Sequence, residues 1–129
     1  LLMTHSINLF AYHLPLDVHP QFGNNALLGK KLGLIETGRF GDQDIAFRGE
    51  LAQATTLGAL GEKISRTLLR KPMIIGDLDR TIRQIAWCTG AAQSYFELAI
   101  QQGVDAYITG EISEQTVHAA RESGVAFIA

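Results

Sequence analysis

The first third of the chain opens with an apolar stretch and continues as a short amphipathic segment. The apolar run at residues 7–12 predicts a buried strand. A helix then follows, which Asn24 or Asn25 can cap and which ends at Gly33. Residues 34–37 predict a second strand.

A longer helical pattern begins at Thr55. Apolar residues recur there at spacings of three, four and four, at Leu57, Leu60, Ile64 and Leu68. This spacing places the four side chains on one face of a helix, and Pro72 ends the run. A short strand over residues 73–75 follows.

The remainder of the chain alternates between strand and helix patterns. The expected elements are a strand at 82–87, a helix at 91–102, a strand at 104–108, a helix at 113–123 and a strand at 125–128. Two successive β-α-β units imply parallel strands joined by right-handed crossovers. The sequence therefore predicts an α/β fold built mostly from parallel β-α-β units.

The polar, glycine-rich stretch from Gly38 to Gly49 is typical of a linker or a hairpin. We place a lobe boundary there, so that residues 1–38 form part of one lobe and residues 39–129 form a second. The chain opens on leucine and stops at Ala129 directly after a predicted strand. We therefore expect an internal fragment of a longer protein, truncated in both lobes.

Composition narrows the classes of function. Eleven Lys and Arg against thirteen Asp and Glu give a formal charge of −2, so no general basic field attracts nucleic acid. The apolar runs are too short to span a bilayer and no signal peptide is evident, so we expect a cytoplasmic protein without a membrane partner. Cys88 is the single cysteine, which excludes an internal disulfide and a multi-cysteine zinc motif.

The segment from Tyr12 to Asn25 concentrates three possible metal ligands, His13, Asp17 and His19. Imidazole and carboxylate groups bind zinc, manganese and non-heme iron. Because a proline lies between His13 and Asp17, we expect the two to meet only if the loop folds back. The alternative is structural: Asp17 caps a turn, His13 packs on the core and His19 lies exposed in a loop.

Two predicted strands end in polar residues, at Cys88-Thr89-Gly90 and at Thr109-Gly110-Glu111. Ligands bind beyond the carboxyl ends of strands in parallel sheets. Glu111 can act as a general base, or it only interacts with the N-terminus of the next helix. Cys88 lacks a visible neighbouring base, so a core or loop cysteine is the favoured interpretation.

Other candidates have structural explanations. His5 and His118 are expected to be solvated or structural residues rather than ligands, and Trp87, Phe96 and Tyr107 to be core aromatics.

Three motifs carry a family resemblance: Y-H-L-P-L-D-x-H-P-x-x-G-N-N, A-W-C-T-G-x-x-Q-S-Y-F and D-A-Y-I-T-G-E-I-S-E-Q-T-V-H-A-A-R-E. Across essentially all 129 residues the chain resembles the GTP cyclohydrolase 1 type 2 homologues, the Nif-three-like family, and most of all its YbgI-type bacterial members. The resemblance implies a Nif-three-like fold of two α/β lobes and a ring-shaped homohexamer.

The resemblance also implies two divalent metal ions, of zinc, manganese or iron, held by an adjacent His-His pair, the aspartate of H-L-P-L-D and a late H-H-x-x-E motif. Only the aspartate matches a position here, Asp17. One carboxylate cannot hold two metal ions, so we expect this chain alone to bind metal weakly or not at all.

For the complete protein we expect a metal-dependent, hydrolase-like enzyme acting on a nucleotide or related small molecule. In that hypothesis Asp17 binds metal, His13 supports it, and Thr109 and Glu111 line the pocket. The alternative is a metal-containing scaffold or regulatory ring without turnover.

Overall fold

One mixed sheet of six strands forms the centre of the computed structural model, which describes residues 1–129. The strands are β1 (Leu34–Phe40), β2 (Ala46–Thr56), β3 (Ile74–Ile75), β4 (Thr81–Cys88), β5 (Ala106–Thr109) and β6 (Ala126–Ile128). Their spatial order is β1-β2-β4-β5-β6-β3. The β4–β5 and β5–β6 pairs are parallel, whereas the other three pairs are antiparallel.

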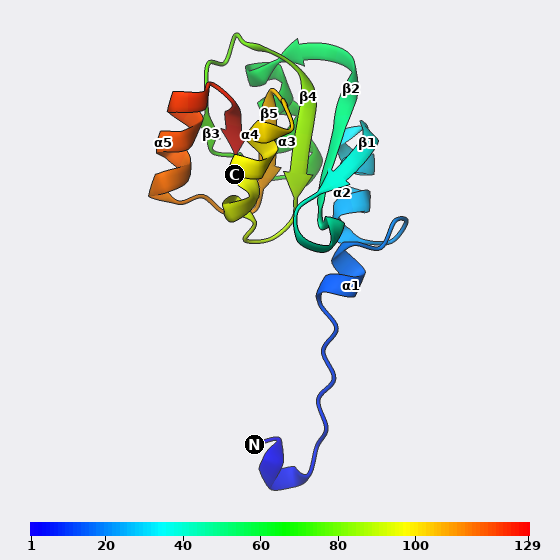
Figure 1. The fold of residues 1–129 in the computed structure, drawn as a ribbon. Coiled ribbons are helices and arrows are strands. Elements are labelled where there is room, and N and C mark those ends of the chain that lie inside the picture. The colour runs from blue at the N-terminus through cyan, green and yellow to red at the C-terminus, as the bar shows by residue number, and fades with distance from the viewer.

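Helices cover both faces of this sheet (Figure 1). They are α1 (Leu14–Asp17), α2 (Asn24–Leu32), α3 (Leu57–Leu68), α4 (Phe96–Gln101) and α5 (Glu114–Ser123), with 3-10 turns at Met3–His5, Asp42–Asp44 and Gln93–Tyr95. Helices α2 and α3 pack into one apolar cluster, and α4 and α5 pack into the other. No helix is long and apolar enough to cross a membrane.

The two clusters arise from alternation along the central strands. In β4, Ile85 and Trp87 belong to the cluster under α2 and α3, while Ala86 and Cys88 belong to the opposite cluster. Successive side chains of a strand point to opposite faces, so the part of β4 that is buried on both faces, residues 85–88, is apolar. The three aromatic residues expected in the core, Trp87, Phe96 and Tyr107, are at most 1% exposed.

The predicted α/β class and its parallel β-α-β units are confirmed for β4, β5 and β6. Helix α5 begins where the sequence predicts, because the Ser113 side chain accepts a hydrogen bond from the Thr116 backbone N–H. It ends at Gly124, whose φ of 70° suits glycine. The predicted helix at residues 91–102 is shorter: a 3-10 turn precedes α4, which begins at Phe96.

The predicted strand at residues 7–12 is wrong. This segment belongs to no helix or strand and its residues are exposed. In Figure 1 it leads away from the body of the molecule toward the N-terminus. A strand needs a hydrogen-bonded neighbour, and no other segment of the 129 residues pairs with it.

The glycine-rich stretch from Gly38 to Gly49 is a hairpin between β1 and β2, one of the two interpretations considered. The pattern missed β2, which is 11 residues long and passes through Gly49. A Cβ at that position would collide with the Ile35 carbonyl oxygen on β1, so the close pairing of the strands requires glycine. The expected boundary between residues 38 and 39 falls inside β1, and the division into two lobes stays a prediction.

Candidate functional site

Asp17 ends the one-turn helix α1 and is 6% exposed despite its charge. Its Oδ2 lies 3.3 Å from the Nδ1 of His13, one turn earlier. Pro15 does not prevent this contact, contrary to expectation, because it occupies the first turn of α1, where a helix needs no N–H donor from it. His13 itself is 83% exposed, so its ring lies beside Asp17 rather than in the core.

The turn that carries Asp17 fits closely against the start of α2. We call residues 13–23 the Asp17 turn. A Cβ at Gly23 would lie 2.5 Å from the carbonyl oxygens of both Leu16 and His19, so only glycine allows this approach. The neighbouring Asn24 donates from Nδ2 to Asp17 Oδ1 at 2.5 Å, which fixes the orientation of the carboxylate.

Asn25, at the start of the same helix, forms hydrogen bonds with other segments of the chain. It is fully buried, its Nδ2 donates to the Ile45 carbonyl at 2.8 Å, and its Oδ1 accepts from the Thr89 N–H at 2.6 Å. Its backbone carbonyl accepts from Trp87 Nε1 at 2.9 Å. Asn25 therefore joins α2 to the end of β4, while Asn24 joins α2 to Asp17.

Two further contacts hold the Asp17 turn. Arg39 on β1 donates from Nη1 to the Val18 carbonyl at 3.0 Å. The exposed His19 accepts from the backbone N–H groups of Gln21 and Phe22 through Nδ1 at 3.2 and 3.1 Å. His19 is thus a turn-stabilising residue in an exposed loop, which agrees with the structural interpretation of its sequence.

The ends of β4 and β5 meet at a pair of Thr-Gly turns. We call Thr89-Gly90 and Thr109-Gly110 the Thr-Gly edge. The Thr109 hydroxyl donates to the Gly90 carbonyl at 3.0 Å and accepts from the Ala92 N–H at 3.3 Å, so it is hydrogen-bonded on both sides. The Gly110 N–H donates to the same carbonyl at 2.9 Å, and a Cβ at Gly110 would lie 2.7 Å from that oxygen.

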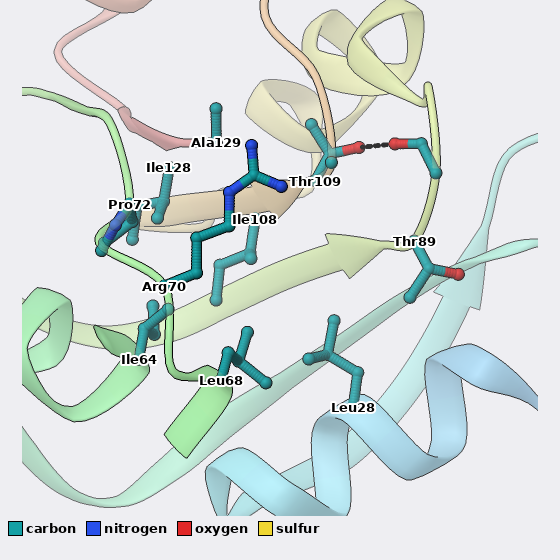
Figure 2. A pocket seen from close by; sticks show the side chains of 12 residues that line it. Leu28, Ile64, Leu68, Arg70, Pro72, Thr89, Ile108, Thr109, Ile128 and Ala129 are labelled. Atoms are coloured by element: carbon teal, nitrogen blue, oxygen red, sulfur yellow. Dashed lines mark hydrogen bonds between the residues drawn. The ribbon is translucent and has the colours of Figure 1, made fainter. Parts of the chain in front are cut away.

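Beside the Thr-Gly edge lies a cavity of about 270 Å³, which we call the Arg70 pocket. It is lined by Leu28, Ile64, Leu68, Arg70, Pro72, Thr89, Gly90, Ile108, Thr109, Gly110, Ile128 and Ala129. Figure 2 shows Arg70 reaching from the loop after α3, with its guanidinium near Thr109 and Ala129. The pocket therefore lies at the carboxyl ends of the three parallel strands, where α/β sheets bind ligands.

The predicted site residues do not all converge on this pocket. Thr109 lines it, whereas His13 and Glu111 do not. Glu111 is exposed and takes part in none of the four ion pairs of the structure. Helix α2 connects the two regions, because Asn24 contacts Asp17 and Leu28, one turn later, lines the pocket.

Cys88 is a core residue, one of the two structural interpretations that the sequence favours. Its side chain is buried, and this burial raises the pKa of the thiol from 9.0 to about 11. The hydrogen bond from Asn25 opposes the rise in pKa, and the nearby charge of Asp17 adds to it. A neutral thiol is a poor nucleophile, so the structure gives Cys88 no catalytic activation at neutral pH.

Burial also raises the pKa of Tyr107, whose hydroxyl donates to the Ala92 carbonyl at 2.7 Å. The phenol is therefore neutral and holds the loop after β4 in place.

The residues of this chain do not by themselves fit a dinuclear metal site. No three His, Cys, Asp or Glu side chains of the 129 residues lie close enough to hold one ion. His13 is the only other potential metal ligand that forms an ion pair with Asp17. Asp17 can supply one carboxylate ligand, and a site for two ions needs several ligands from elsewhere.

The sequence did not predict the contacts that three residues make in this region: Asn24, Asn25 and Arg70. The triplet Gly23-Asn24-Asn25 follows the His/Asp cluster closely. This closeness in sequence could have indicated that the asparagines contact the cluster. The sequence indicated Asn24 or Asn25 as the cap, whereas the N-cap residue of α2 is Gly23. No sequence pattern predicted that Arg70 lines the pocket, because its position depends on how the loop after α3 crosses the edge of the sheet.

Comparison with known proteins places this geometry in a family. The family model described as Duf34/NIF3 (NGG1p interacting factor 3) matches residues 1–129. A relative from Neisseria meningitidis serogroup B, named GTP cyclohydrolase 1 type 2 homolog, is 54% identical over 127 residues, covering 98% of this chain and 51% of the relative. A relative of the same name from Pseudomonas aeruginosa is 47% identical over 133 residues, covering 99% and 52%.

A solved structure of protein ybgI, described as of unknown function, superposes with a TM-score of 0.87 at 43% identity. The match covers 99% of this chain and 51% of that one. The chain thus spans about half the length of the curated relatives it matches. With a family model that matches all of its residues, and with the expected motifs and fold in place, the chain belongs to the Duf34/NIF3 family.

Proposed function

We propose that this chain is part of a metal-dependent, hydrolase-like protein that acts on a nucleotide or a related small molecule. The observation that carries the proposal is the state of Asp17: a carboxylate 6% exposed, without a Lys or Arg partner, oriented by the amide of Asn24. A buried carboxylate lacking a cation is costly unless a positive group pairs with it. A divalent cation supplies such a charge.

Asp17 is the one residue of this chain that we assign as a metal ligand. His13 supports it through the 3.3 Å contact with Oδ2, and Asn24 holds the other carboxylate oxygen. The remaining ligands of the two divalent ions, whether zinc, manganese or iron, are proposed to come from other parts of the complete protein. We also propose a cytoplasmic homohexamer, on the family resemblance.

Metal content of the complete protein tests the assignment of Asp17. We expect Asp17→Ala and Asp17→Asn to lower the bound metal per subunit, measured by inductively coupled plasma mass spectrometry. Asp17→Asn keeps an oxygen that can accept from Asn24, so it removes the charge with little change of shape. Asp79→Ala, at an exposed carboxylate outside this region, is the matched control and should leave metal content unchanged.

If the Asp17 variants retain all of their metal, Asp17 is not a ligand. A folded Asp17→Asn protein, verified by circular dichroism, makes that result decisive.

A second candidate is a non-catalytic metal-containing scaffold or regulatory ring. The family description refers to an interacting factor, and this chain exposes a run of large apolar side chains: Leu9, Phe10 and Tyr12 are 73%, 77% and 79% exposed. Such a run is typical of a surface that another polypeptide covers.

A substrate screen with metal-loaded complete protein separates the two candidates. Saturable turnover of a nucleotide that Asp17→Asn abolishes and Asp79→Ala preserves supports the hydrolase. Absence of turnover across nucleotides and related phosphate esters, with metal bound, supports the scaffold.

A further inference from the structure

We propose that the Arg70 pocket binds the anionic group of a small organic ligand, with the ligand's apolar or ring portion held against the pocket walls. The proposal extends the function above to the part of the ligand that lies away from Asp17. Its anion-binding element, Arg70, does not depend on metal.

The shape and lining of the pocket suit a small molecule. A cavity of about 270 Å³ has room for a single ring system with a substituent, near the lower end of ligand pockets in general. Leu28 and Leu68 form an apolar wall from two helices, and Ile108 and Ile128 form another from the sheet. These side chains favour the apolar part of a ligand.

The charge in the pocket has one sign. Arg70 is its only charged lining residue, and no acidic side chain lines it. None of the four ion pairs in the structure involves Arg70. A guanidinium that lacks a carboxylate partner and faces a concave apolar surface is suited to a phosphate or carboxylate group, which it can bind through two parallel N–H donors.

The backbone before Arg70 supports this placement. Helix α3 ends at Leu68. The next residue, Leu69, has a φ of 55° although it is not glycine, and its side chain is 91% exposed. The left-handed conformation is unfavourable for leucine, so the surrounding structure must hold it. This turn directs the chain toward Pro72 and the paired backbones of Met73 and Ala129, so that Arg70 lies over the pocket (Figure 2).

Neutral polar groups complete the site. The Thr89 hydroxyl makes no hydrogen bond within the protein, while its backbone N–H is held by Asn25. The Thr109 hydroxyl, in contrast, already donates and accepts. Thr89 is therefore the lining threonine whose hydroxyl has no hydrogen-bond partner within the protein.

Binding of phenyl phosphate to the complete protein, with metal removed by a chelator, tests the pocket. Isothermal titration at low salt should give saturable binding that weakens as ionic strength rises. We expect Arg70→Gln to weaken it roughly 10- to 100-fold, because a charge-assisted hydrogen bond is lost. Arg70→Lys should retain part of the affinity, since it keeps the charge but not the planar fork.

Lys71→Gln is the matched control. It removes the same charge from the next residue, which is also exposed but does not line the pocket, and should change affinity less than about twofold. Equal effects of Arg70→Gln and Lys71→Gln, or absence of binding, would overturn the proposal. Thr89→Val should weaken binding less than Arg70→Gln does.

Two further ligands distinguish failure of this proposal from failure of the proposed function. GMP and guanosine are titrated in the same way, since they differ by the phosphate. Arg70-dependent binding of phenyl phosphate without binding of GMP supports the pocket and counts against a nucleotide substrate. Arg70-dependent binding of GMP, with guanosine much weaker, supports both.

Discussion

The Asp17 turn and the Thr-Gly edge both present polar groups, but they are held in place by different forces. The edge continues the buried ends of two strands, residues 85–88 of β4 and 106–109 of β5, and a backbone hydrogen bond joins Gly110 to Gly90. The Asp17 turn has only Asp17 and Gly23 buried, and side-chain contacts from Asn24 and Arg39 fix it to the rest of the chain.

The two regions therefore contribute differently: the sheet stabilises the fold, and the Asp17 turn orients the proposed metal ligand. Apolar burial in the sheet supplies the larger part of the folding free energy, whereas the polar contacts of the turn each contribute little and mainly orient one carboxylate. A few side chains, Asn25 above all, connect the two regions. Substitutions matched across the two regions therefore test the comparison directly.

The largest effect is expected from a pair of phenylalanines. Phe127 on β6 is fully buried, with ring centroids 5.0 Å from Phe96 and 5.8 Å from Tyr107. Phe127→Ala should lower the free energy of unfolding by about 3–5 kcal/mol, through lost burial and the cavity left behind. Phe22 in the Asp17 turn is 67% exposed, and Phe22→Ala should cost less than about 0.5 kcal/mol.

Urea unfolding of the complete protein, followed by circular dichroism, measures both variants. Similar losses of stability for Phe127→Ala and Phe22→Ala would contradict the division of the molecule into a stabilising sheet and an adjustable turn.

An intermediate effect is expected from the neighbouring asparagines. Asn25→Ala removes a fully buried side chain that bonds the part-buried Thr89 N–H and Ile45 carbonyl, so it should cost about 2–3 kcal/mol. Asn24 is exposed and its side chain makes one hydrogen bond, to Asp17, so Asn24→Ala should cost less than about 1 kcal/mol. Unfolding curves of the two variants, recorded under one set of conditions, compare the two effects.

For metal binding, we expect Asn24 to matter more than its small effect on stability indicates. Asn24→Ala frees the Asp17 carboxylate to rotate and should reduce metal affinity in a protein that remains stable. If Asn24→Ala unfolds the protein as readily as Asn25→Ala, the turn is part of the stabilising core.

The sheet could be predicted from sequence where local pattern and tertiary structure agree. Ile85 and Trp87 alternate with Ala86 and Cys88, and both pairs are buried, so the apolar run of β4 is readable without its neighbours. Ser113 and Gly124 mark the ends of α5 because cap chemistry is local. The same local reasoning failed at residues 7–12, where an apolar run has no strand beside it.

The candidate site was less predictable because its contacts join distant segments. Asn25 meets Thr89 across 64 positions in the sequence, and the role of Gly23 depends on two carbonyl groups that approach it in space. Arg70 belongs to the pocket only because β3 pairs with β6 and brings the loop after α3 to the sheet edge. Spacing along the chain contains none of this information.

The smallest effect is expected from Cys88, whose thiol lies where the two regions meet. Its Sγ is 4.0 Å from Asn25 Nδ2 and 3.9 Å from the Ile45 carbonyl oxygen. Burial raises its pKa from 9.0 in the unfolded chain to about 11 in the fold. The neutral thiol therefore stabilises the fold fully below pH 9, and this stabilisation is lost as the pH rises toward 11.

The free energy of unfolding of the unmodified protein should fall by about 1 kcal/mol more than that of Cys88→Ala between pH 8 and pH 10. Urea unfolding of both proteins at several pH values measures the difference, and groups such as Tyr107 that titrate in both proteins cancel. Parallel pH profiles would mean that water reaches the thiol in the folded protein. The contact between α2 and the end of β4 would then be looser than the hydrogen bonds of Asn25 require, and the orientation of Asp17 would no longer be tied to the sheet.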